Sequence, residues 1–169
     1  STTYNTSQPT AGRRPTYRTN IFNGNPVLRF TSAGATHTSL DFGSMGISGT
    51  SDLNFFIVLR PSVANGGAVN DGSGGYILDR TPASASSQPL VGLKLLSTNR
   101  IGYQKRTDAG TQLGGVSTTT AFSLTVPQII DYYRDYGVRY GIYNNGTQEA
   151  ILAEADGPTT LPNLRMGSH

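Results

Sequence analysis

Cysteine is absent from this 169-residue sequence, which excludes disulfides, zinc–thiolate sites and catalysis by a thiol. Tryptophan is absent as well, and lysine and glutamate occur only twice each. Because strong helix formers are this scarce, a helical bundle is excluded. No apolar run approaches the ~18 residues of a membrane-spanning helix, so we expect no insertion into a membrane.

Threonine, serine and glycine are abundant instead, with 21, 16 and 21 residues. β-Branched residues favour strands, and glycine and serine favour the turns between them. The length fits one domain, and 36% of the residues are hydrophobic. The composition therefore predicts an all-β domain.

The net charge is +3, with eleven arginines in the chain. A nucleic-acid surface needs such charges gathered on one face, whereas the close cluster here is Arg13, Arg14 and Arg18, interrupted by Pro15. We interpret this cluster as a solvated entry segment and expect no nucleic-acid partner. Residues 1–20 lack periodicity and are predicted to be an extended N-terminal arm, with the folded domain over 21–169.

Short strand patterns follow one another along the rest of the chain. Near the end, Asn145-Gly146 separates two apolar-rich runs, which predicts a tight hairpin that pairs 138–144 with 148–154. About ten short strands with turn residues between them predict an antiparallel β-sandwich or jelly roll. The other predicted strands are Val27–Phe30, His37–Phe42, Leu53–Arg60, Tyr76–Arg80, Leu90–Leu96, Arg100–Lys105, Phe122–Val126, Gln128–Tyr136 and Leu164–Gly167.

A succession of short motifs over 13–168 carries a family resemblance. In order they are RRPTY (13–17), NGNPVLRF (23–30), SLDFG (39–43), DLNFFIVLRP (52–61), GYILDR (75–80), VGLKLL (91–96), GIYNNGTQ (141–148) and LRMGS (164–168). The succession resembles the laminin-G-like, concanavalin A-like lectin/glucanase superfamily, of the kind found in phage virion proteins and bacterial surface proteins. The resemblance implies a concanavalin A-like jelly roll.

The first and last strands of that superfamily have no counterpart in this sequence. Unpaired edge strands invite pairing with other chains. We therefore expect Leu164–Gly167 to border a sheet position that a neighbouring chain, or further residues of the same polypeptide, fills.

Glycosidases of this superfamily carry acidic residues at alternate positions of one strand. Residues i and i+2 of a strand face the same side, and a retaining mechanism needs paired carboxylates. Glu154 and Asp156 provide half of such a pattern, but position 159 is threonine and Gly157-Pro158 ends the strand. We therefore predict that the protein is not an enzyme, with a glucanase-type glycan hydrolase as an alternative.

Oxygen ligands gather in the glycine-rich stretch 62–75, where Asp71 and Ser73 are the candidate ligands for calcium. Laminin-G-like domains often hold calcium at a rim, which the resemblance carries over as an expectation. Calcium takes six to eight oxygens, and a single carboxylate seldom suffices. An unliganded loop is the alternative, and no other cofactor is expected.

Five of the nine tyrosines lie between 132 and 143. Sugar-binding sites combine flat aromatic faces with amide and carboxylate groups, so we predict a carbohydrate site from the following residues: Tyr132, Tyr136, Tyr143, Asn144 and Asn145. The alternative is that the tyrosines pack between the sheets with their hydroxyls at the edge.

Taken with the resemblance, these features predict a non-enzymatic module of a larger virion or cell-surface protein, of fibre or decoration type. Its predicted role is adhesion or carbohydrate recognition, outside the cell or on a virion surface, with glycans and neighbouring chains of an assembly as partners. A structural spacer or capsid-binding domain without sugar binding is a further alternative.

Overall fold

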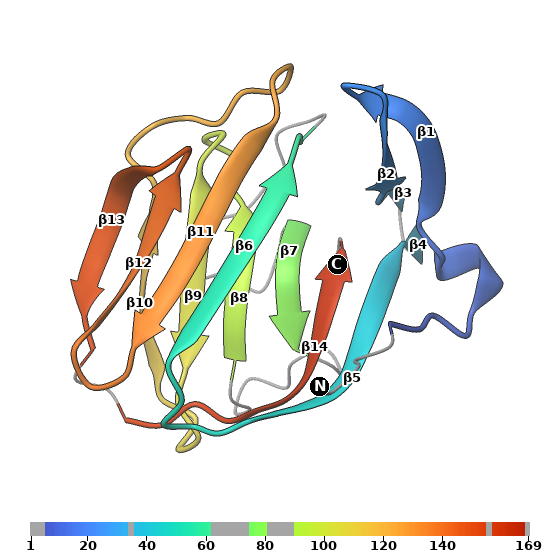
Figure 1. The fold of residues 1–169 in the computed structure, drawn as a ribbon. Coiled ribbons are helices and arrows are strands. Elements are labelled where there is room, and N and C mark those ends of the chain that lie inside the picture. Colours follow the sequence, from blue (N-terminus) through green and yellow to red (C-terminus); the bar gives the residue numbers. More distant parts are fainter. Residues whose placement is uncertain (1–5, 34–35, 62–74, 81–89, 155–156, 168–169) are drawn as a thin grey trace.

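The computed structural model describes residues 6–33, 36–61, 75–80, 90–154 and 157–167. Within them the chain forms two antiparallel sheets that face one another, so the predicted all-β sandwich is confirmed (Figure 1). In this part of the chain, no helix has the length and apolar character needed to cross a membrane.

The larger sheet has six strands in the order β10-β9-β8-β7-β14-β5. Every neighbouring pair is antiparallel. The strands are β5 (Ser39–Ile47), β7 (Gly75–Arg80), β8 (Leu90–Leu95), β9 (Ile101–Arg106), β10 (Gln112–Ser117) and β14 (Leu161–Gly167).

The smaller sheet has four strands in the order β13-β12-β11-β6, again all antiparallel. It lies across the larger sheet and stops at β6, so β14 and β5 extend beyond it (Figure 1). The strands are β6 (Leu53–Leu59), β11 (Gln128–Asp135), β12 (Arg139–Asn144) and β13 (Thr147–Ala153).

Two small hairpins and a single turn of 3-10 helix, η1 (Ala11–Arg13), stand beside the sandwich. In one hairpin β1 (Thr16–Phe22) pairs with β2 (Asn25–Arg29), and in the other β3 (Ser32–Ala33) pairs with β4 (Thr36–His37). β1 runs through residue 20, with a register shift between Arg18 and Phe22, and the predicted boundary between arm and domain stays a prediction.

The core forms between the two sheets from alternate residues of each strand. Along β11 the side chains of Ile130, Tyr132 and Arg134 are buried, while Ile129 and its alternate neighbours face outward. Tyr103 of β9 meets this layer from the larger sheet. Each fully buried apolar side chain contributes about 1.5–3 kcal/mol, so these contacts hold the sheets together.

The predicted Asn-Gly hairpin is present. Asn144 pairs with Thr147, and both Asn145 (φ 50°) and Gly146 (φ 81°) have the positive φ that such a turn requires. The sequence alone therefore located the β12–β13 turn.

Several strand assignments from the sequence differ from the structure. Thr16–Phe22 and Ser32–Ala33 form short strands that were not predicted. Residues 122–126 form no strand: Phe122 is buried, and the Ser123 hydroxyl accepts hydrogen bonds from the backbone of Thr125 and Val126. The strand Gln112–Ser117 was not predicted, because its glycine pair hides the alternation.

The open edge of the sandwich is not where the sequence placed it. Strand β14, which contains Leu164–Gly167, lies between β7 and β5 and pairs with both. The prediction of a vacant position beside it was therefore wrong. In the described residues, the strand with a partner on one side and the most regular pairing is β6.

Candidate functional site

A cluster of buried charges lies inside the sandwich at one end. It consists of Lys105 on β9, Arg134 on β11 and Glu154 just after β13, and we call it the charge cluster. All three side chains are fully buried, and the Glu154 carboxylate accepts hydrogen bonds from both cations, with Arg134 Nε at 2.8 and 3.1 Å. Buried charges persist only when they are paired in this way.

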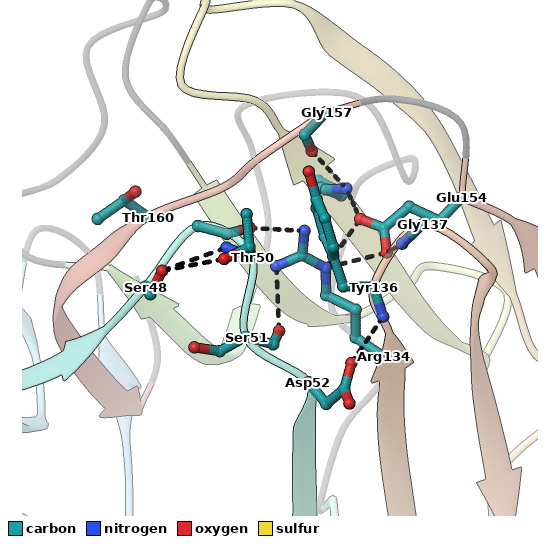
Figure 2. Close-up of polar contacts among 12 residues, drawn as sticks. Ser48, Thr50, Ser51, Asp52, Arg134, Tyr136, Gly137, Glu154, Gly157 and Thr160 are labelled. Atoms are coloured by element: carbon teal, nitrogen blue, oxygen red, sulfur yellow. Dashed lines mark hydrogen bonds and ion pairs between the residues drawn. The ribbon is translucent and has the colours of Figure 1, made fainter.

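Backbone groups complete the charge cluster and tie neighbouring loops to it (Figure 2). Arg134 donates to the carbonyl oxygens of Gly49, at 2.9 Å, and Ser51, at 3.5 Å. Both residues belong to the segment in which the chain crosses from β5 in one sheet to β6 in the other. The Lys105 ammonium donates to the carbonyl oxygen of Gly157 at 3.3 Å. The charge cluster therefore fixes how the two sheets are connected.

The charge cluster has no access to a substrate. Glu154 is the glutamate that the sequence offered for acid–base catalysis, yet both of its carboxylate oxygens are engaged by buried donors. The second glutamate, Glu149, accepts hydrogen bonds from Thr119 and Thr120, which lowers its pKa. The two glutamates thus stabilise the fold at separate places. Asp156, the other acidic residue of the predicted pattern, lies outside the described residues.

An open depression of about 290 Å³ lies where the start of β6 meets the end of β11. We call it the outer depression. Its aromatic and polar side chains lie on the solvent side of the smaller sheet, and its lining residues are Asp52, Leu53, Asn54, Tyr133, Arg134 and Asp135. The Arg134 side chain is buried in the charge cluster, so it offers no free charge there.

Tyr133 is the aromatic residue of the outer depression, and its ring packs against Gly141. The two residues are register partners on β11 and β12. A Cβ atom at Gly141 would lie 2.9 Å from the Tyr133 ring and 2.6 Å from the Ala150 carbonyl oxygen. The absence of a side chain therefore lets the ring lie over β12. Arg139 and Tyr143 flank it, with centroid distances of 5.7 and 5.6 Å.

Electrostatics on this outer face are dominated by carboxylates. Asp135 has Arg139 as an ion-pair partner at 3.8 Å, and Asp52 accepts a hydrogen bond from the Tyr136 backbone at 2.8 Å. Burial raises the pKa of Asp131, whose Oδ1 atom is buried without a hydrogen-bond partner. Burial also raises the pKa of Tyr133, so its hydroxyl stays protonated at neutral pH. The face therefore presents an aromatic ring beside mostly hydrogen-bond acceptors.

Tyr132 was predicted to contact sugar, and the structure contradicts this. Its side chain is 0% exposed, its ring stacks on Tyr103 at 4.6 Å, and its hydroxyl donates to the Tyr103 hydroxyl at 2.8 Å. Burial raises its pKa well above the ordinary value. A ring enclosed between two sheets cannot present a face to a ligand.

The remaining predicted residues do not form one site. Tyr136 lies at the Asp135 end of β11, with the Arg134 guanidinium 4.9 Å from its ring. Asn144 is buried, and the Asn145 side chain accepts a hydrogen bond from the Ile129 backbone at the opposite end of the strand. Six residues of strand, roughly 20 Å, separate Ile129 from Asp135. Tyr143 is half-buried and shares the outer face with Tyr133.

The predicted calcium ligands Asp71 and Ser73 lie outside the described residues. Within the described ranges, no three or more histidine, aspartate or glutamate side chains are grouped so that they could hold a metal ion. Calcium binding thus stays a prediction.

Sequence reasoning missed Tyr133, Asp135 and the β6 residues of the outer depression. One signal was available: Asp131 and Asp135 share the odd positions of β11 with Tyr133, and carboxylates mark a solvent face. The buried Arg134 at an even position obscured this signal. Asp52 and Asn54 join the site only through the pairing of β6 with β11.

No protein-family model and no curated protein matches this sequence. Solved structures do match its fold. The binding domain of Paraclostridial Mosquitocidal Protein 1 superposes with a TM-score of 0.71 at 12% identity, covering 98% of this chain and 40% of that chain. A structure of botulinum neurotoxin type C, whose cell entry depends upon interaction with two ganglioside molecules, superposes with a TM-score of 0.58 at 13% identity. The match covers 98% of this chain and 38% of that chain.

The CBM40 of the Ruminococcus gnavus IT-sialidase, bound to α2,3-sialyllactose, gives a TM-score of 0.52 at 14% identity and covers 72% of this chain and 64% of that chain. The chain thus spans less than two thirds of the length of each of these three proteins. At such low identity the likeness shows the fold alone, which is a β-sandwich of two antiparallel sheets.

Proposed function

We propose that this chain is a non-enzymatic carbohydrate-recognition module that binds glycans at the outer depression. The observation that carries the proposal is the Tyr133 ring, seated over Gly141 beside the Asp52, Asn54 and Asp135 side chains. Aromatic faces pack against the C–H groups of a sugar ring, while carboxylates and amides bind its hydroxyls. Structural neighbours named for ganglioside interaction and for bound sialyllactose support this role.

The charges of the outer depression favour neutral glycans over sialylated ones. Asp52 and Asp135 line it, Asp131 lies on the same face, and Arg139 is the one cation beside them in the described part of the face, already paired with Asp135. A sialic acid carboxylate would meet net negative charge, whereas the hydroxyls of a neutral sugar find acceptors.

The setting that we propose is a larger surface or virion protein of the fibre or decoration type, acting in adhesion. Partial coverage of the neighbouring proteins is consistent with a module of a longer polypeptide. The alternative of a purely structural module is favoured by one observation: Phe56 and Val58 expose large apolar side chains on the outer face.

A glycan array probed with the 169-residue chain, with calcium and with a chelator, tests the proposal. We expect binding to neutral glycans and a loss of about 10-fold in affinity, or about 1.4 kcal/mol, for Tyr133→Ala. Tyr17→Ala is the matched control, because Tyr17 is an exposed tyrosine on the separate β1–β2 hairpin.

Three results would count against parts of the proposal. Absence of glycan binding would overturn it and favour the structural role. Binding restricted to sialylated glycans would overturn the neutral specificity alone. Binding that Tyr133→Ala leaves unchanged would place the site elsewhere, and binding that needs calcium would support the predicted ligands Asp71 and Ser73.

A further inference from the structure

The positive charge of this protein is concentrated in its N-terminal part. Residues 1–40 contain four arginines and no lysine, aspartate or glutamate, whereas the rest of the chain carries nine basic and ten acidic residues. Arg18 and Arg29 lie on the β1–β2 hairpin, which stands beside the sandwich, and both are exposed (Figure 1). Neither forms an ion pair with a carboxylate in the part of the chain that the structure describes. The hairpin is therefore a positively charged extension of a nearly neutral sandwich.

The register of the hairpin places these two arginines on one face. Arg29 pairs with Thr16, and Arg18 pairs with Val27. Directly opposed residues of two strands share a face, and so do alternate residues of one strand. Arg18 and Arg29 are therefore diagonal neighbours on the same face, with Cα atoms about 7–8 Å apart. At this spacing the two long side chains reach a single anionic group together.

Arg60, at the end of β6, brings a third guanidinium to this face. Phe22 of β1 pairs with Asn25, which lies on the same side of β2 as Val27 and Arg29. The Arg60 guanidinium lies 5.9 Å from the centroid of the Phe22 ring. The three arginines are exposed, and the two apolar side chains between them are half-buried. We call this surface the basic face, and it consists of Arg18, Arg29, Arg60, Phe22 and Val27.

The basic face has charges to balance and a hairpin to stabilise. Like charges on one face of a strand pair repel one another. A two-stranded hairpin by itself is only marginally stable in water, and most residues of β1 and β2 are exposed. An anion bound between the guanidinium groups would remove the repulsion. Arginine suits this role, because its planar fork of donors matches the oxygens of a carboxylate or of a tetrahedral oxyanion.

We propose that the basic face is a second binding site, for an anionic polysaccharide that carries carboxylate or sulfate groups. The arginines bind the charged groups, and Phe22 and Val27 offer apolar contact to the C–H groups of the sugar rings between them. The inference does not depend on the proposed function. Asp52 of the outer depression precedes β6 and Arg60 follows it, so the length of the strand, about 23 Å, separates the two sites.

Two other polyanions fit this surface less well. A membrane surface favours an apolar tip, whereas the hairpin turns at the polar residues Asn23 and Gly24. Duplex DNA carries one charge for about every 1.7 Å of its axis. Such a continuous polyanion would extend from the basic face to the carboxylates of the outer face, which repel it. The charges of a polysaccharide are separated by sugar rings.

Isothermal titration calorimetry with four probes tests the proposal on the 169-residue chain. The probes are a sulfated heparin oligosaccharide, an oligogalacturonate, a DNA duplex and vesicles that contain phosphatidylserine. We expect one or both of the oligosaccharides to bind, and the one that binds more tightly identifies the anionic group. The affinity should fall as salt is raised, because exposed charges are screened. The duplex and the vesicles should bind more weakly.

Charge reversal locates the site. Arg18→Glu and Arg29→Glu should each lower the affinity by about 10-fold or more, because each removes a charge-assisted contact and adds repulsion. Arg100→Glu is the matched control: Arg100 is exposed in the turn between β8 and β9, and its reversal changes the net charge equally. It should leave the affinity within about twofold, as expected of a charge away from the site. Far-UV circular dichroism checks that each variant retains the β spectrum.

Three outcomes would overturn the proposal. They are the absence of binding to both oligosaccharides, an equal loss of affinity in Arg100→Glu and Arg18→Glu, and tighter binding of the duplex or the vesicles than of either oligosaccharide. The neutral glycans of the array report on the outer depression and the charged probes on the basic face, so either proposal can fail while the other stands.

Discussion

The two faces of β11 use similar residues for different purposes. On the inner face, Arg134 and Tyr132 are fully enclosed, and their polar groups bind other buried parts of the chain. On the outer face, Asp135 and Tyr133 are partly exposed, and the Asp135–Arg139 pair is open to solvent. A charge or ring in the sealed layer stabilises the fold, whereas the same type of group one residue away is partly exposed.

Removing the anion of the charge cluster tests the inner face and should have the largest effect. Glu154→Gln leaves Lys105 and Arg134 buried without a countercharge, so we expect the free energy of unfolding to fall by about 3–5 kcal/mol. Urea denaturation measures it. Glu149→Gln is the matched control and should cost about 1 kcal/mol or less, because Glu149 is partly exposed and glutamine still accepts the threonine hydrogen bonds. Equal losses for the two variants would contradict the comparison.

The packing of the Tyr133 ring against Gly141 links the outer face to the stability of the fold. Gly141→Ala introduces a Cβ atom that conflicts with the Ala150 carbonyl oxygen and with the Tyr133 ring. We expect a loss of about 1–3 kcal/mol in urea denaturation, as for other overpacked sites, together with weaker glycan binding. Gly12→Ala is the control, since a Cβ atom there meets nothing within 4 Å. A Gly141→Ala chain as stable as the Gly12→Ala chain would disprove the close packing of this ring.

The smallest effect is expected at Asp131 on the outer face. Burial raises its pKa in the folded state, so the folded chain holds this proton more tightly than the unfolded chain. Stability from this group is present below the unfolded pKa and is lost as the pH rises through the folded pKa. Asp131→Asn should therefore raise the urea midpoint slightly at about pH 7 and leave it unchanged at about pH 3. A difference that grows on acidification would reverse the assignment.

The sequence predicted the architecture better than the site, and β11 shows why. Its period-two pattern predicted a strand with two faces, but the pattern does not say which face points inward. Tyr132 and Tyr133 are the same type of residue. Tyr132 is the buried one because Tyr103 of β9 packs against the even positions of β11. The Asn145-Gly146 turn, in contrast, was predicted correctly because its backbone geometry depends on those two residues alone.

Three features of this protein follow from the sequence alone. Its fold is all-β, its last hairpin turns at Asn145-Gly146, and it has no cysteine chemistry. The tertiary structure decided the rest. Lys105, Arg134 and Glu154 are distant in sequence and become a buried cluster only when the two sheets close over them. The smaller sheet ends at β6, whereas the strand that contains Leu164 has a partner on both sides. Whether a strand lies at an edge depends on how all the strands of its sheet pair. Such long-range pairing carries no local signal, whereas a turn or a strand period does.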